Sequence, residues 1–125
     1  MDSVFHLIPI EESARRFIVA LEREGYPVER AVWARNQYGT GFLFIEPSQM
    51  DDLRIASDKL FEIRHRLFAE IPNLVDVNTI VVEPGDWKLS TARSLHDVAP
   101  EKPRPIGRIS EGWQSYEDAI VMKAA

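Results

Sequence analysis

The stretch "PSQMDDLRIASDKLFEIRHRLFAEIP" (residues 47–72) contains the pattern that most restricts the possible folds. Its apolar residues recur at spacings of three and four, which places them on one stripe of an α-helix: Leu53, Ala56, Leu60, Ile63 and Leu67. Ser48 and Asp51 form an approximate capping box at the start of this helix, and Pro72 ends it. Because such a stripe must be buried against another layer, the chain is expected to form a layered domain.

A second helix and four strands are predicted around it. The segment 11–25 is predicted to be helical, because Ala14, Phe17, Ile18 and Leu21 share one face and Gly25 is placed to end it. Strands are predicted over residues 4–10, 28–37, 42–46 and 75–83. The two middle strands are joined by "YGTG" (38–41), whose glycines permit the positive φ angles of a tight hairpin turn.

The resulting order, β-α-β-β-α-β, predicts an α+β domain over residues 1–85. The expected arrangement is ferredoxin-like, with four antiparallel strands and two helices on one face of the sheet. No sequence repeat relates the two halves of this unit, so the fold is predicted from the order of elements alone.

Residues 86–125 are predicted to form an irregular C-terminal extension that ends in a short helix, "SYEDAIVMKAA" (115–125). Three prolines between residues 100 and 105 interrupt regular structure there. The extension carries three large aromatic residues, Trp87, Trp113 and Tyr116, in a segment too irregular to form its own core. These side chains are therefore expected to pack on the domain or on a partner chain.

The cysteine content, the net charge and the hydropathy of the chain exclude or disfavour several classes of protein. The chain has no cysteine, which excludes disulfides and thiolate chemistry. With 15 Lys and Arg against 20 Asp and Glu, the net charge is −5, which is unfavourable for binding a phosphate backbone. The beginning, "MDSVFHLIPI", lacks the basic start and long apolar centre of a signal peptide, and no run reaches membrane-helix length. We predict a soluble, cytoplasmic protein that does not bind membranes.

The segment "YGTGFLFI" (38–45) resembles part of the glycine–aromatic consensus of the RNA-recognition motif. Gly39, Gly41, Phe42 and Leu43 match that consensus, and the order of elements is similar to that of the family. The resemblance implies single-stranded RNA binding through the sheet. However, the two positions that would stack bases are Thr40 and Ile45, and neither is aromatic. RNA binding is therefore the least favoured of three functional predictions.

Residues that could carry catalysis or bind a metal show no recognisable pattern. The histidines, His6, His65 and His96, are not spaced as metal ligands, and no nucleophile elbow or phosphate-binding loop is present. Glu46 and Glu83 are predicted at opposite ends of the sheet, which does not indicate an acid pair. The sequence therefore predicts no cofactor and no metal, and it favours a non-enzymatic protein.

The preferred prediction is a binding or regulatory module that acts through protein–protein contacts and self-associates as a homodimer. Its candidate contact residues are the aromatics of the extension, Trp87, Trp113 and Tyr116. The alternative is a dimeric α/β-barrel enzyme or carrier for a small molecule, in which two sheets enclose a cavity. For that alternative the candidate binding residues are His6, Trp33 and Arg35.

Overall fold

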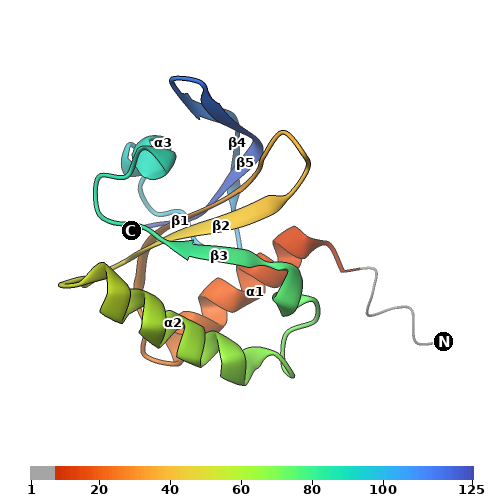
Figure 1. Ribbon diagram of the computed structural model, residues 1–125, viewed down its shortest axis with the longest axis vertical. Coiled ribbons are helices and arrows are strands. Elements are labelled where there is room, and N and C mark those ends of the chain that lie inside the picture. Colours follow the sequence, from red (N-terminus) through yellow and green to blue (C-terminus); the bar gives the residue numbers. More distant parts are fainter. Residues whose placement is uncertain (1–7) are drawn as a thin grey trace.

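The computed structural model describes residues 8–125, which form one mixed five-stranded sheet with helices on both faces (Figure 1). In chain order the elements are α1 (Ile10–Arg23), β1 (Val28–Arg35), β2 (Gly41–Pro47), α2 (Leu53–Leu67), the short 3₁₀ helix η2 (Leu74–Asp76), β3 (Asn78–Val81), the 3₁₀ helix η3 (Trp87–Leu89), α3 (Ser90–Arg93), β4 (Arg104–Glu111) and β5 (Gln114–Ala124). No helix within the described residues is long and apolar enough to cross a membrane.

The strand order is β3-β2-β1-β5-β4. Strand β2 pairs antiparallel with β1 and parallel with β3, so α2 is the connection between two adjacent parallel strands. Strand β5 pairs antiparallel with both β1 and β4. The last segment of the chain therefore lies inside the sheet, and β3 and β4 form its two edges.

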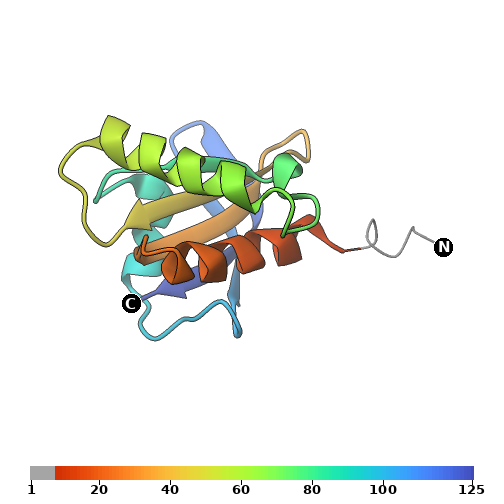
Figure 2. The ribbon, with the colours of Figure 1, turned by 90° about the horizontal axis from the view of Figure 1, so that it is seen from below.

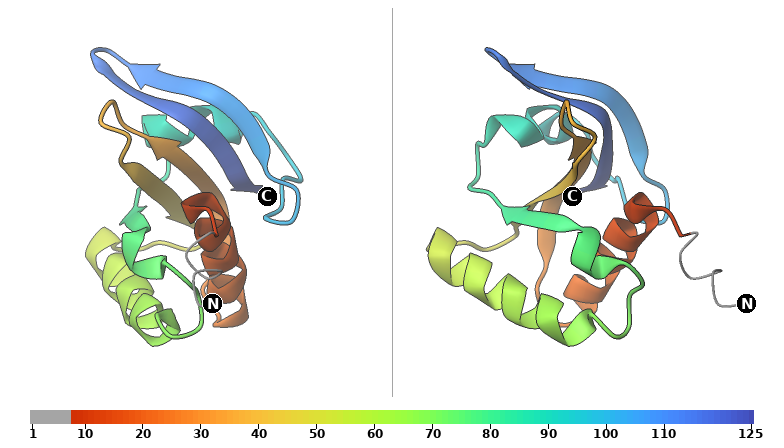
Figure 3. Two further views of the ribbon diagram at one scale, coloured as in Figure 1. Left: turned by 90° about the vertical axis from the view of Figure 1, so that its right-hand side faces the viewer. Right: turned by 45° about the vertical axis from the view of Figure 1, so that its right-hand side comes forward.

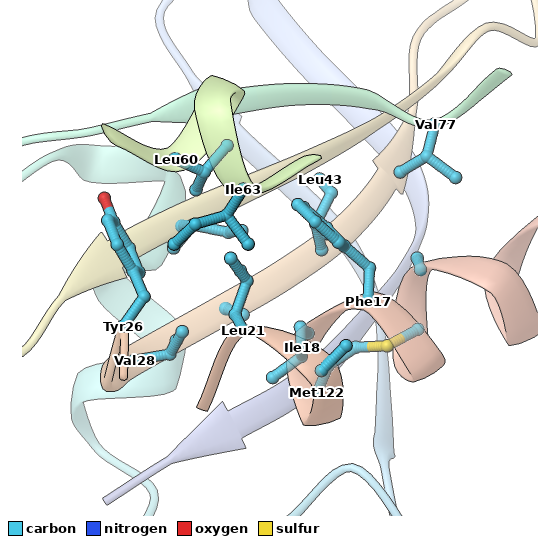
Figure 4. Packing of buried hydrophobic residues seen from close by; sticks show 14 of the residues in the cluster. Phe17, Ile18, Leu21, Tyr26, Val28, Leu43, Leu60, Ile63, Val77 and Met122 are labelled. Carbon is cyan, nitrogen blue, oxygen red and sulfur yellow. The ribbon is translucent and has the colours of Figure 1, made fainter. Parts of the chain in front are cut away.

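Helices α1 and α2 lie side by side on one face of the sheet, and η3 and α3 lie on the other (Figures 1 and 2). The first face holds the larger core, in which apolar residues of α1 and α2 meet the strands (Figure 4): Phe17, Ile18, Leu21, Val28, Leu43, Leu60, Ile63, Val77 and Met122. The second face holds a smaller core beneath η3 and α3: Val32, Ala34, Phe44, Leu89, Ala92 and Val121, among others.

The ferredoxin-like prediction is wrong. The sheet has five strands rather than four, and one of its pairs, β2 with β3, is parallel. Most of the predicted strand 4–10 lies outside the described residues, and its last residue, Ile10, is the first residue of α1. The two long helices and the β1–β2 hairpin are confirmed, because each is specified by periodicity within its own segment.

The predicted C-terminal helix is also wrong, because residues 114–124 form β5. This strand is central, and its apolar run packs on both faces: Ile120 and Met122 reach the first core, while Ala119 and Val121 reach the second. A short run that is apolar on both sides cannot be distinguished from a buried helix by its periodicity. Irregularities in the β1–β5 pairing, with Asp118 at φ 53°, further obscure the alternation.

Two smaller corrections concern local signals. Helix α2 is capped by Asp52, which accepts hydrogen bonds from the backbone N–H groups of Arg54 (2.8 Å) and Ile55 (3.2 Å), and not by the predicted box of Ser48 and Asp51. The proline-rich part of the extension contains the edge strand β4, where Pro105 is tolerated because an edge strand pairs on only one side.

Candidate functional site

Two hairpin turns lie close together at one end of the sheet (Figure 3, left). Each turn carries an exposed aromatic side chain. Tyr38, between β1 and β2, is 81% exposed, and Trp113, between β4 and β5, is 90% exposed. The turns are neighbours because β1 pairs with β5. A hollow of about 340 Å³ lies between them, and we call its lining the hairpin-tip surface: Asn36, Gln37, Tyr38, Trp113, Gln114, Ser115 and Tyr116.

The first turn is held in shape by Asn36. Its side-chain oxygen accepts hydrogen bonds from the backbone N–H groups of Tyr38 (2.9 Å) and Thr40 (3.0 Å). Its backbone N–H donates to the carbonyl of Thr40 at 2.9 Å, and Gly39 supplies the positive φ angle (81°) that closes the turn. The Tyr38 ring therefore projects from a loop whose backbone is already ordered.

The second turn is shorter. Glu111 pairs with Gln114, which leaves Gly112 and Trp113 as the two central residues of the hairpin. Gly112 has a φ of 60° and Trp113 does not have a positive φ, which is the pattern of a type II′ turn. Because such a turn follows the twist of its strands, Trp113 is presented at the tip of a compact, well-defined loop.

An aromatic cluster lies beneath this end of the second sheet face: Phe42, Phe44, Trp87 and Tyr116. The Tyr116 ring contacts Phe44 edge-on at 5.2 Å between centroids and lies 6.1 Å from both Phe42 and Trp87. Lys88 lies over this cluster, with its Nζ 5.3 Å from the Phe44 centroid and 3.1 Å from an oxygen of Asp86. Tyr116 belongs to both the cluster and the hairpin-tip surface, so it anchors the second hairpin to the domain.

The structure brings together the three aromatic residues that were predicted as contacts in the extension. Trp113 and Tyr116 line the same hollow, and Trp87 packs on Tyr116. The structure does not bring Trp33 and Arg35 to this surface. Trp33 is 1% exposed within the first core, and Arg35 is paired with Glu11 of α1, with 2.8 Å between their charged atoms.

His6 lies outside the described residues. Sequence reasoning did not find the polar residues of the hairpin-tip surface, nor Tyr38 on that surface, nor Phe42 and Lys88 at the aromatic cluster beneath it. The sequence could have predicted that Tyr38 is exposed, because an aromatic residue in the middle of a glycine-containing turn has no core position to occupy. Phe42 and Lys88 gave no such signal, since their contacts join segments that are far apart in the sequence.

Among residues 8–125, the resolved pKa shifts lie outside the hairpin-tip surface. A hydrogen bond from Arg15 lowers the pKa of Glu12 to about 2, and burial raises the pKa of Tyr26 to about 12. In the same part of the chain, no group of three His, Asp or Glu residues is placed to hold a metal ion. What the hairpin-tip surface offers is aromatic rings, amides and hydroxyls, which bind by losing water and by hydrogen bonding.

Comparison of the chain with protein-family models, with curated proteins and with solved structures found no match.

Proposed function

We propose that this protein is a binding module that contacts a protein partner through the hairpin-tip surface. The observation that carries the proposal is the position of Trp113, whose side chain is 90% exposed at the tip of a type II′ turn. Exposure of a large indole ring to water is unfavourable in free energy, and tryptophan is among the residues most enriched at the centres of protein interfaces. Burying such a side chain against a partner contributes on the order of 2–4 kcal/mol.

The surroundings of Trp113 support the same function. Tyr38 lies across the hollow and adds a second exposed ring. Gln37, Gln114 and Ser115 line the same hollow and add amide and hydroxyl groups to it. This combination of aromatic anchors and adaptable hydrogen-bonding groups is typical of protein-recognition loops. Because both turns are ordered by their own hydrogen bonds, little conformational entropy is lost on binding.

The two other predicted functions require an open sheet face, and the burial of this sheet speaks against them. Leu43 and Ile45 of β2 are buried under α1 and α2, and Phe44 is buried under η3 and Tyr116. A barrel formed by two sheets, or bases stacked along a sheet, would need side chains of this strand at the surface. We therefore propose neither a barrel enzyme nor an RNA-binding protein.

The test is affinity capture with the full chain as bait, followed by quantitative mass spectrometry. The baits are the wild type, the double variant Trp113→Ser/Tyr38→Ser, and the control Val19→Ser/Ile55→Ser. The control removes two other exposed apolar side chains, which are 45% and 60% exposed on α1 and α2. We expect the same partner with the wild type and the control, and at least about a tenfold loss with the hairpin-tip variant. Equal recovery by all three baits would refute the proposal.

A further inference from the structure

Strand β3 leaves one side of its backbone without a partner among the described residues. It is an edge strand that pairs only with β2. The N–H of Val82 donates to the carbonyl of Ile45 at 2.9 Å, and Ile45 lies opposite Val81. Since inward and outward backbone groups alternate along a strand, the N–H and C=O groups of Thr79 and Val81 point away from the sheet.

Exposed apolar side chains lie near this edge, and the charged residues Glu83, Asp86 and Lys88 line the same hollow as Leu53 and Ile80. We call the apolar side chains the β3-edge surface: Leu53, Phe61, Phe68, Val75 and Ile80, which are between 37% and 68% exposed. Leu53 and Ile80 line one hollow, and the guanidinium of Arg64 lies over the rings of both Phe61 and Phe68. The same group donates to the backbone carbonyls of Leu74 and Val77, immediately before β3. Phe61 and Phe68 therefore lie on the side of α2 that faces the β3 edge.

We propose that this edge binds a second copy of the same chain, with β3 antiparallel to its symmetry mate about a two-fold axis at Ile80. In that register Thr79 of each chain faces Val81 of the other, and all four outward backbone groups of each strand find partners. Ile80, which is 39% exposed, then faces its own copy as a non-hydrogen-bonded pair, where side chains approach most closely.

The arrangement of α2 favours a second copy over an unrelated strand. Phe61 and Phe68 are exposed on the side of α2 that faces the β3 edge. The two-fold axis that joins the strands brings the same two side chains of the second copy to the other side of the edge, so each copy supplies apolar surface that covers the other's. A two-fold interface requires self-complementarity of this kind.

This inference is independent of the proposed function. The β3 edge and the β4–β5 hairpin lie at opposite sides of the sheet, because the strand order is β3-β2-β1-β5-β4. The dimer would therefore leave Trp113 of each chain free and would present two of these side chains to partners, which increases the apparent affinity for a bivalent target.

The test is sedimentation equilibrium of the full chain over a range of concentrations. We expect the wild type to be a dimer of 28.6 kDa, twice the chain mass of 14.3 kDa. Ile80→Lys and Ile80→Glu should each weaken the dimer by about 100-fold or more, because like charges meet at the axis. A mixture of the two variants should regain a heterodimer, because lysine then faces glutamate. Circular dichroism checks that each variant is folded, and Trp113→Ser should dimerise like the wild type.

Three results would overturn the proposal. The first is a monomeric wild type at concentrations up to about 100 µM, a range that detects even weak dimers. The second is a dimer that persists in Ile80→Lys, or one that is lost in Trp113→Ser, since either places the interface elsewhere. The third is slow hydrogen exchange at the Thr79 and Val81 amides in a monomer, because the edge would then be covered by the chain itself, for example by residues 1–7.

Discussion

Replacing Gly41 with alanine tests how the base of the β1–β2 hairpin is packed. A Cβ atom at this position would lie well inside contact distance of the outer ring carbons of Trp33, which lies diagonally across the two strands. Trp33 is 1% exposed, so its ring cannot move into water. Gly41 does not have a positive φ, and alanine can adopt its backbone conformation without strain. The expected effect is therefore steric.

The size of the effect follows from the packing. Forcing an extra carbon into a filled core costs about 1–3 kcal/mol, and we expect about 3 kcal/mol because the overlap is with a rigid ring. Each kcal/mol lowers the melting temperature of a domain of this size by about 3–5 °C, so Gly41→Ala should melt about 10 °C below the wild type. Circular dichroism during thermal and urea unfolding measures both quantities.

Two further variants separate the clash from other causes. Gly39→Ala is the control, because Gly39 has a φ of 81° but open space around it, so its cost is the left-handed backbone penalty of about 1–2 kcal/mol. Trp33→Phe removes the ring atoms that alanine would meet, and the double variant should be less destabilised than the sum of the single ones by about 1–2 kcal/mol. Additive losses, or a loss below about 0.5 kcal/mol for Gly41→Ala, would show that the added Cβ atom does not clash with Trp33.

Three other predictions concern single groups. The pKa of Glu12 is lowered from 4.5 to about 2, so its ion pair stabilises the fold above pH 4.5 and this contribution is lost as the pH falls towards 2. In Glu12→Gln the free energy of unfolding should therefore change less between pH 4.5 and pH 2 than in the wild type. Urea unfolding across that range measures this, and parallel curves for both proteins would contradict it. Between pH 10 and 12 the Tyr26 hydroxyl ionises in the unfolded chain but stays neutral in the folded state, because burial raises its pKa to about 12. The wild type should therefore lose stability over this range, and Tyr26→Phe should not show this part of the loss. Thermal unfolding in that range tests it, and an unchanged alkaline loss in the variant would speak against it. Asp52→Ala should cost about 1 kcal/mol by uncapping α2, whereas Asp51→Ala should change the free energy of unfolding by less than about 0.5 kcal/mol; equal losses in urea unfolding would show that the cap has been misassigned.

The parts of the fold that were predictable are those specified by local patterns. Helices α1 and α2 have apolar residues at helical spacing, and the β1–β2 hairpin has a glycine-containing turn between two apolar segments. On β2, Phe42 and Phe44 lie on one face and Leu43 and Ile45 on the other, as the alternation of a strand predicts.

The parts that were not predictable depend on which elements meet. The run "AIVM" (119–122) is apolar because β5 lies between two strands and under two layers, and this position is known only once the sheet is assembled. The parallel pairing of β2 with β3 is likewise set by how α2 packs, not by residues within either strand.

The candidate site was partly predictable for the same reason. The sequence identified three large side chains without a local core: Trp87, Trp113 and Tyr116. In the structure Trp113 and Tyr116 line one hollow, and Trp87 packs on Tyr116. Trp33 was assigned to the cavity of the predicted two-sheet barrel, and the sequence does not reveal that both faces of its strand are covered within this domain.

Site-specific photo-crosslinking tests the proposed partner surface most directly. A benzophenone amino acid replaces either Trp113 or Ile55 in the full chain, and these positions are 90% and 60% exposed in the wild type. After irradiation in cells of the protein's source, adducts are resolved by mass spectrometry. If the hairpin-tip surface binds a protein, position 113 should give one dominant covalent adduct and position 55 should give none. If position 113 gave no adduct, or if both positions captured the same proteins equally, the hairpin-tip surface would not be the surface that binds the partner.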